Sequence, residues 1–136
     1  MANRDLAQRF IDALGRLEQD GDAEPLVQLF ADDCTLRNAA SHRVFRGRED
    51  VRHFWREYRG SFRDVRSRFR SVAPSDGTVA LEWSTEGTAP DGNPIRYEGV
   101  SILEIDGSRI RRFHAYFDPR RLGRQLFEGE PAASHP

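Results

Sequence analysis

The chain has 136 residues, enough for one domain with a sizeable core. Its formal net charge is −1 with 32% charged residues, a balance of signs that disfavours nucleic acid as a partner. No apolar run approaches the roughly 18 residues that a membrane-spanning helix needs. The single cysteine, Cys34, fits a reducing cytoplasm, and without a Cys/His cluster we expect no metal and no cofactor. We therefore expect a cytoplasmic protein that makes no membrane contact.

Two amphipathic helices are predicted at the start of the chain. The first starts at Asn3 or Asp5, carries apolar residues at three- and four-residue spacing, and stops at Asp20-Gly-Asp22. A shorter second helix follows, in which an early proline is tolerated because an amide at that place has no helical partner. We expect the second helix to extend to Phe30 and to break at Asp32-Asp33.

A short strand, a loop and a third helix come next. The segment from Cys34 to Asn38 is predicted to be a strand, and residues 39–46 a loop. Gly47-Arg-Glu-Asp then opens a helix. Its apolar face carries Val51, Phe54, Trp55 and Tyr58.

The second half of the chain is rich in strands. We predict strands at 62–72, 78–88, 95–105 and 109–117, separated by turn-forming Pro, Gly, Asn and Asp residues. Asp106-Gly107 is a dipeptide favoured in tight hairpins, so the last two strands are expected to pair. Three helices followed by a run of antiparallel strands predict an α+β fold with the helices packed on one face of the sheet.

The domain is expected to span residues 3–127. After Pro119 we expect at most a short helix at 121–127, and residues 128–136 are predicted to be a disordered tail.

Alternation in the last strand predicts a pocket. Successive side chains of a strand point to opposite faces. One face carries Phe113, Ala115 and Phe117, and the other carries Arg112, His114 and Tyr116. An apolar face needs a cover, and the amphipathic helices supply one, so we expect a cupped pocket. His114 faces away from the pocket and is expected to lie on a dimer surface formed by the sheet.

All 21 basic residues are arginines. Arg66, Arg68 and Arg70 share one face of their strand, as Glu82 and Glu86 share one face of the next. Cross-strand Arg–Glu pairs neutralise such a row. We therefore favour a ladder of ion pairs over a site for nucleic acid.

Several segments resemble a known superfamily. They are Leu29-Phe-Ala-Asp-Asp-Cys-Thr-Leu36, Phe45-Arg-Gly-Arg-Glu-Asp-Val51, and Gly107-Ser-Arg-Ile110 with Tyr116-Phe-Asp118. With the order of the elements, they resemble the nuclear-transport-factor-2-like superfamily, in particular its SnoaL-like polyketide cyclases and ketosteroid-isomerase-like proteins. The resemblance implies a cone-shaped barrel (a cystatin-like roll): three N-terminal helices on a strongly curved, mostly antiparallel sheet, with an apolar cavity, in a homodimer. These segments are specific for the fold rather than for a reaction, because this fold hosts many activities.

The acidic residues that act in these relatives have no counterpart here. The general-base carboxylate of ketosteroid isomerases falls at Asn38, and an amide does not accept a proton at neutral pH. Their oxyanion-hole tyrosine and aspartic acid fall at Phe10 and Ser101. The water-activating aspartate of limonene-type epoxide hydrolases falls at Ala115. The resemblance therefore implies neither steroid isomerisation nor epoxide hydrolysis by those mechanisms.

The candidate catalytic residues are Asn38, Ser101 and His42. Asn38 and Ser101 can supply hydrogen bonds, and His42, in a loop at the expected cavity mouth, is the remaining candidate base. The candidate ligand-binding residues are Phe10, Leu14, Trp55, Tyr58, Trp83, Tyr97, Leu103, Phe113, Ala115 and Phe117. The alternative is that the large aromatic residues only fill the core, and we favour it for Trp83.

We expect the protein to bind a small, largely apolar or aromatic molecule in an internal cavity. If it is an enzyme, the expected reaction is a cofactor-free isomerisation, cyclisation or hydration. A non-catalytic module that binds a ligand or another protein is the alternative, because the acidic residues of the relatives are missing. An ionised aspartate or glutamate deep inside the cavity would overturn this interpretation.

Overall fold

The computed structural model describes residues 2–122 of the chain. Its elements are α1 (Ala2–Asp20), α2 (Glu24–Val27), β1 (Phe30–Asn38), β2 (Phe45–Arg46), α3 (Gly47–Gly60), β3 (Asp64–Ser75), β4 (Thr78–Thr88), β5 (Pro94–Asp106) and β6 (Arg109–Phe117). Residues 119–122 are helical, and both the rest of the predicted short helix and the predicted tail at 128–136 lie outside the described residues. Within residues 2–122, no helix combines the length and hydropathy needed to cross a membrane.

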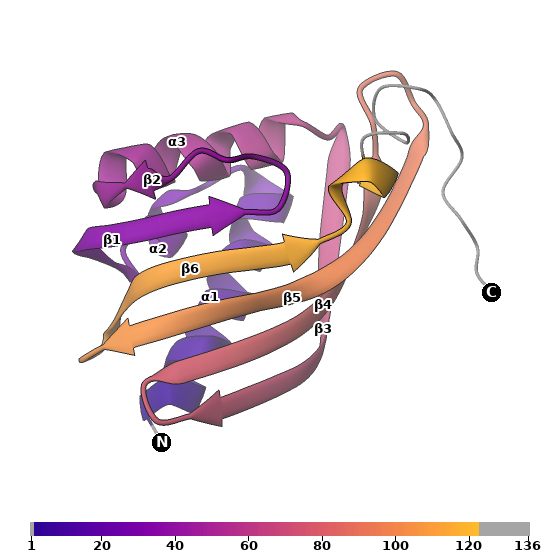
Figure 1. The fold of residues 1–136 in the computed structure, drawn as a ribbon. Coiled ribbons are helices and arrows are strands. Elements are labelled where there is room, and N and C mark those ends of the chain that lie inside the picture. Colours follow the sequence, from indigo (N-terminus) through magenta and orange to yellow (C-terminus); the bar gives the residue numbers. More distant parts are fainter. Residues whose placement is uncertain (1, 123–136) are drawn as a thin grey trace.

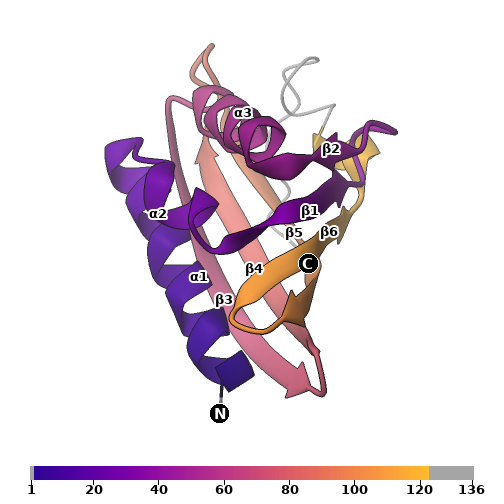
Figure 2. The same ribbon diagram turned by 90° about the vertical axis from the view of Figure 1, so that its left-hand side faces the viewer.

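Six strands form one sheet in the order β2-β1-β6-β5-β4-β3 (Figure 1). β1 and β6 run parallel, and every other neighbouring pair is antiparallel. The sheet does not close, because β2 and β3 are its two edges. It curves around the helices, which lie on its inner side (Figure 2). The predicted α+β cone, with three helices on a strongly curved and mostly antiparallel sheet, is confirmed.

One face of α1 is buried against the sheet. Its apolar residues recur at three- and four-residue spacing and are at most 6% exposed: Leu6, Phe10, Ala13, Leu14 and Leu17. Glu18 follows Leu14 by four residues and therefore lies on the same face, where it is only 5% exposed. The helix ends at Asp20, and the following Gly21, with a positive φ of 74°, donates its N–H to the Leu17 carbonyl.

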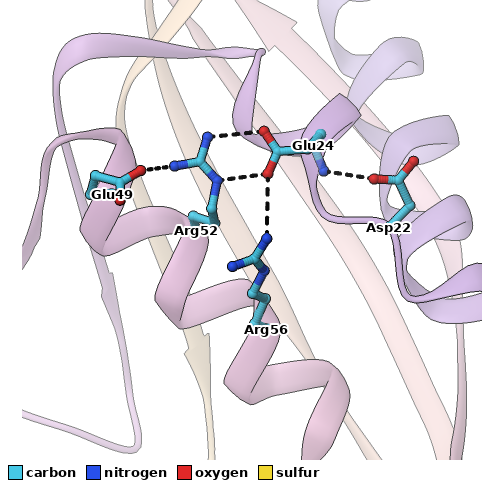
Figure 3. Close-up of polar contacts among 5 residues, drawn as sticks. All are labelled: Asp22, Glu24, Glu49, Arg52 and Arg56. Carbon is cyan, nitrogen blue, oxygen red and sulfur yellow. Dashed lines mark hydrogen bonds and ion pairs between the residues drawn. The ribbon is translucent and has the colours of Figure 1, made fainter.

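A surface cluster of Glu24, Glu49, Arg52 and Arg56 joins α2 to α3 (Figure 3). Arg52 binds Glu24 at two points, with Nε–Oε2 at 2.6 Å and Nη2–Oε1 at 2.9 Å, and it also pairs with Glu49. Arg56 lies 3.8 Å from the same Glu24 carboxylate. The hydrogen bonds from Arg52, aided by the charge of Arg56, hold the pKa of Glu24 below its ordinary value.

The second helix is shorter than predicted. It ends at Val27, and Phe30, assigned to it from the sequence, is the first residue of β1 and fully buried. Asp32 and Asp33 lie within β1 instead of breaking a helix. The register of β1 against β6 shifts between Phe30 and Thr35, and this irregularity leaves the two aspartates exposed. Pairing with β6 thus outweighs the local preference of the segment.

The predicted ladder between β3 and β4 is confirmed at two places. Arg66 lies 3.6 Å from Glu86, and Arg70 lies 3.6 Å from Glu82. Arg68 is instead opposite Ser84. These ion pairs are exposed, so each contributes little to stability.

Close packing of β4, β5 and β6 positions Trp83. The predicted alternation in β6 is confirmed, because Phe113 and Ala115 are buried while Tyr116 is 47% exposed on the outer face. In β5, a Cβ atom added at Gly99 would lie 2.2 Å from the Tyr116 carbonyl oxygen and 2.8 Å from Trp83 Cζ2. Only glycine therefore fits where the indole of Trp83 lies against β5.

Candidate functional site

A cavity of about 540 Å³ is enclosed by α1, α3 and the inner face of the sheet. Most of its wall is apolar or aromatic. Ala40, Ser41 and Glu57 line it and are exposed, so they mark its mouth.

Nine of the ten predicted ligand-binding residues line this cavity: Phe10, Leu14, Trp55, Tyr58, Trp83, Tyr97, Phe113, Ala115 and Phe117. Leu103 does not, since it is fully buried in the core. The sequence pattern finds these residues because helical spacing and strand alternation identify inner faces. It does not distinguish a side chain beside the cavity from one packed in the core.

Of the three candidate catalytic residues, Asn38 and Ser101 line the cavity and His42 does not. Asn38 Oδ1 accepts the Ala40 amide at 2.8 Å, which leaves the side-chain NH₂ group for a ligand. Trp83 Nε1 donates to Ser101 Oγ at 2.9 Å, so the hydroxyl proton of Ser101 remains for another acceptor. His42 is exposed in the loop after β1.

An inner polar cluster of Glu18, Tyr58, Ser67 and Thr85 lies at the cavity wall. Glu18 Oε2 accepts the Tyr58 hydroxyl at 2.8 Å and the Ser67 hydroxyl at 2.6 Å, and its Oε1 accepts the Ser67 amide at 2.9 Å. Ser67 Oγ and Thr85 Oγ1 are 2.7 Å apart. Tyr58, Ser67 and Thr85 line the cavity, and Glu18 stands directly behind them.

The protons of this cluster are donated to Glu18, directly from Tyr58 and Ser67, or to Ser67 from Thr85. Both of its oxygens act only as acceptors, the pattern of an ionised carboxylate. Ser67 has one hydroxyl proton, which it gives to Glu18, so Thr85 must be the donor in the bond between Thr85 and Ser67. The Tyr58 and Thr85 oxygens can therefore offer only lone pairs to a ligand.

Glu18 has no cationic partner among residues 2–122. Its three hydrogen-bond donors are neutral, and no arginine or histidine of the described chain forms an ion pair with it. Its charge nevertheless affects two tyrosines of the cavity wall. Burial, followed by the neighbouring Tyr97 and Glu18, raises the pKa of Tyr58, and burial and Glu18 raise the pKa of Tyr97. Both phenols are neutral at physiological pH.

The sequence analysis did not identify Glu18 as part of the site. Its buried carboxylate does not line the cavity but binds Tyr58 and Ser67, which do, so among the described residues no aspartate or glutamate lies deep inside the cavity itself. The signal was present as four-residue spacing, since Phe10, Leu14 and Glu18 fall on one line along α1.

Aromatic rings surround the space near this cluster. Trp83, Tyr97 and Phe117 form a mutually contacting trio, with ring centroids 5.3 to 6.0 Å apart and large interplanar angles. Tyr58 and Phe62 add an edge-on pair at 5.6 Å. All five line the cavity.

No three His, Cys, Asp or Glu side chains gather within the described residues in a way that could hold a metal ion. Cys34 is buried away from the cavity wall, and burial raises the pKa of its thiol. A thiol in such a place packs as a small apolar group.

Solved structures show the same fold at low sequence identity. A nuclear-transport-factor-2-like protein of unknown function from Burkholderia pseudomallei is 16% identical, with a TM-score of 0.83 over 93% of this chain and 98% of that one. A ketosteroid-isomerase-like protein from Catenulispora acidiphila, in complex with trimethylamine, is 19% identical, with a TM-score of 0.77 over 90% and 93%. An LEH-like epoxide hydrolase from M. tuberculosis is 18% identical, with a TM-score of 0.71 over 92% of each chain.

No curated protein matches the chain. The profile of the SnoaL-like domain matches residues 7–113, from the first turns of α1 to the middle of β6. The three solved structures cover 90%, 93% and 92% of the chain, a larger part than the profile matches. The chain therefore belongs to the SnoaL-like domain family and has the nuclear-transport-factor-2-like fold.

Proposed function

We propose that this protein binds a small, largely apolar or aromatic molecule in the cavity between α1, α3 and the sheet. The observation that carries the proposal is the cavity itself: about 540 Å³, walled mainly by aromatic and aliphatic side chains with a few separated polar groups. This is the usual design of a small-molecule site. Asn38 and Ser101 each keep a free donor for a polar group of that molecule. A protein of the same fold in complex with the small molecule trimethylamine agrees with this use of the fold.

Binding is favoured over proton-transfer catalysis. Among the described residues, the wall holds one carboxylate, Glu57, which is exposed at the mouth and paired with His53 at 3.2 Å. Glu18 is screened from the cavity by the hydroxyls that it holds. A cofactor-free isomerisation, cyclisation or hydration is the second candidate, favoured by the Tyr58 hydroxyl held in place by a carboxylate. In that case Asn38→Ala would abolish turnover of the bound molecule, and unchanged turnover would remove Asn38 from the mechanism.

The test is a ligand screen by thermal shift and calorimetry with aromatic polyketides, steroids and terpenoid epoxides. A ligand at 100 times its Kd raises the free energy of unfolding by about 2.7 kcal/mol. Ala115→Phe adds a ring inside the cavity and should abolish binding. Ser84→Phe adds a ring on the exposed outer face of β4 and should leave binding unchanged. Equal binding by both variants would show that the ligand sits elsewhere.

We further propose that the outer face of the sheet forms a homodimer. Val100 and Tyr116 are its exposed large hydrophobic residues, 37% and 47% exposed, and they are paired across β5 and β6. Exposed apolar patches of this kind mark interfaces. Sedimentation should give a dimer for the wild type and a monomer for Tyr116→Asp, and a monomeric wild type would contradict the proposal.

A further inference from the structure

We propose that the ligand of the cavity is an organic amine in its ammonium form, with the charged nitrogen held at Tyr58 and Thr85 in front of Glu18. The inference rests on the proposed function, whose ligand class it narrows. It is carried by three features of the cavity wall at Tyr58 and Thr85: an unpaired charge, the direction of the hydrogen bonds that this charge imposes, and the aromatic wall.

The unpaired charge is that of Glu18. Burying an ionised carboxylate is costly unless it is both hydrogen-bonded and paired. Glu18, 5% exposed, has its hydrogen bonds but no cationic partner within residues 2–122. Arginine is abundant in this chain, and Glu24, six residues later, binds two of them. A cation supplied by a ligand would pair with the Glu18 carboxylate as arginine pairs with the Glu24 carboxylate.

The direction of the hydrogen bonds selects for donors. Because Tyr58 and Ser67 give their protons to Glu18, and Thr85 gives its proton to Ser67, the Tyr58 and Thr85 oxygens present only lone pairs to the cavity. An ammonium N–H matches these oxygens. A carboxylate or a carbonyl oxygen at the same place would meet lone pairs and the negative charge behind them.

The aromatic wall suits a positive charge. Trp83, Tyr97 and Phe117 contact one another at 5.3 to 6.0 Å, and all three line the cavity together with Tyr58. A cation near the face of such rings is attracted by their quadrupoles, most strongly by tryptophan. Glu18 adds to this field, since its charge reaches far enough to raise the pKa of Tyr97.

No positive charge competes at the inner end. The charged residues of the wall, among those described, are Arg43 and Glu57, both near the mouth. Arg43 lies over the ring of Phe45, 4.2 Å from its centroid, and Glu57 pairs with His53. Arg43 also lies 4.0 Å from Asp50, so both wall charges have partners of their own, and Glu18 is the charged side chain bound to Tyr58 and Ser67.

The test compares three probes that share a benzyl or phenyl ring but differ in charge: benzylamine, which is protonated at pH 7, benzyl alcohol and benzoate. Calorimetry on the wild type should show benzylamine binding about tenfold tighter than benzyl alcohol, with benzoate weakest; tenfold corresponds to about 1.4 kcal/mol. Glu18→Gln keeps the shape of the side chain and should bring the first two probes to within about twofold of each other. Asp12→Asn removes the same charge from the exposed face of α1 and should leave the tenfold preference intact.

The outcomes separate this inference from the proposed function. If benzyl alcohol binds as well as benzylamine, or if Glu18→Gln keeps the preference, the ammonium assignment is overturned and the small-molecule cavity stands. If none of the three probes binds but a neutral aromatic molecule from the screen does, the ammonium assignment is again overturned and the small-molecule cavity stands. If nothing binds in either experiment, both proposals fall. The order of the probes on the wild type decides the matter even where Glu18→Gln fails to fold.

Discussion

Glu18 and Glu24 lie six residues apart in the sequence and are held in opposite ways. Glu24, at the surface, is bound by the guanidinium of Arg52 at two points and approached by Arg56 (Figure 3). Glu18, inside, is bound by a tyrosine, a serine hydroxyl and a backbone amide, and by no charge. The surface cluster neutralises its carboxylates, whereas the inner polar cluster only solvates one.

This difference decides how far the charge of each carboxylate acts on its surroundings. An exposed ion pair is screened by solvent and contributes little. A buried carboxylate held by neutral dipoles keeps its field, because the surroundings are less polarisable than water. The inner polar cluster thus orders Tyr58, Ser67 and Thr85 at the cavity wall, while the surface cluster only helps to join α2 to α3.

The largest effect is expected for Glu18→Ala, which removes the buried carboxylate. We expect the free energy of unfolding to fall by about 3 kcal/mol, because three donors at a buried site lose their acceptor. Urea denaturation measures it. Asp12→Ala, on the exposed face of α1, should change stability by no more than about 0.5 kcal/mol. A loss at Glu18 as small as that at Asp12 would show that the cluster does not hold the wall together.

High pH tests the phenols of Tyr58 and Tyr97 in the cavity wall. Burial, with the charge of Glu18, raises the pKa of Tyr58 and of Tyr97 above the unfolded value of about 10. The folded state then keeps protons that the unfolded state releases. The contribution of the two tyrosines is therefore complete below about pH 10 and is lost as the pH rises toward the folded pKa values, by about 1.4 kcal/mol per tyrosine at pH 11. Urea midpoints at pH 9 and 11 measure the fall.

The control for this prediction is the double variant Tyr58→Phe/Tyr97→Phe. It should lose most of the slope above pH 10. Cys34 adds a slope of the same sign, because burial raises the pKa of its thiol too, and this part should remain in the double variant. A slope unchanged by the double substitution would assign the whole effect to other groups.

Tyr58→Phe alone removes one donor from Glu18. We expect a loss of about 1.5 kcal/mol, the lower end for a hydrogen bond to a charged group, since the other two donors remain. Tyr97→Phe is the matched control, because the Tyr97 hydroxyl makes no hydrogen bond within the described residues, and its loss should stay below about 0.5 kcal/mol. Equal losses would place the effect in ring packing rather than in the bond to Glu18.

The fold and most of the cavity wall could be predicted from the sequence, because they follow from local periodicity. Alternation placed Phe113, Ala115 and Phe117 on the inner face of β6, and spacing placed Phe10 and Leu14 on that of α1. The ends of the helices and strands were predicted less well. Phe30 begins a strand because β6, far along the chain, supplies a partner.

The inner polar cluster could not be predicted from local periodicity. Glu18 lies on the buried line of α1, but its partners Tyr58 and Ser67 are 40 and 49 positions away. Which acid near a helix end is buried depends on the elements that pack over it, here α3 and β3. The loop that carries His42 has no periodicity, so its position relative to the cavity mouth was not determined by any pattern.

The smallest effect is expected at the surface cluster. Glu24→Gln should lower the free energy of unfolding by about 0.5 kcal/mol in dilute buffer, because the carboxylate is 46% exposed and its pairs are screened. Since Arg52 lowers the pKa of Glu24, the contribution is present above the unfolded pKa and disappears as the pH falls through the folded value. It should also vanish in about 1 M salt, where the Debye length is about 3 Å. The loss at Glu18→Ala should persist in the same salt, since its partners are neutral. Urea denaturation of both variants at low and high salt measures the contrast, and equal salt sensitivity would mean that the two carboxylates are not held differently after all.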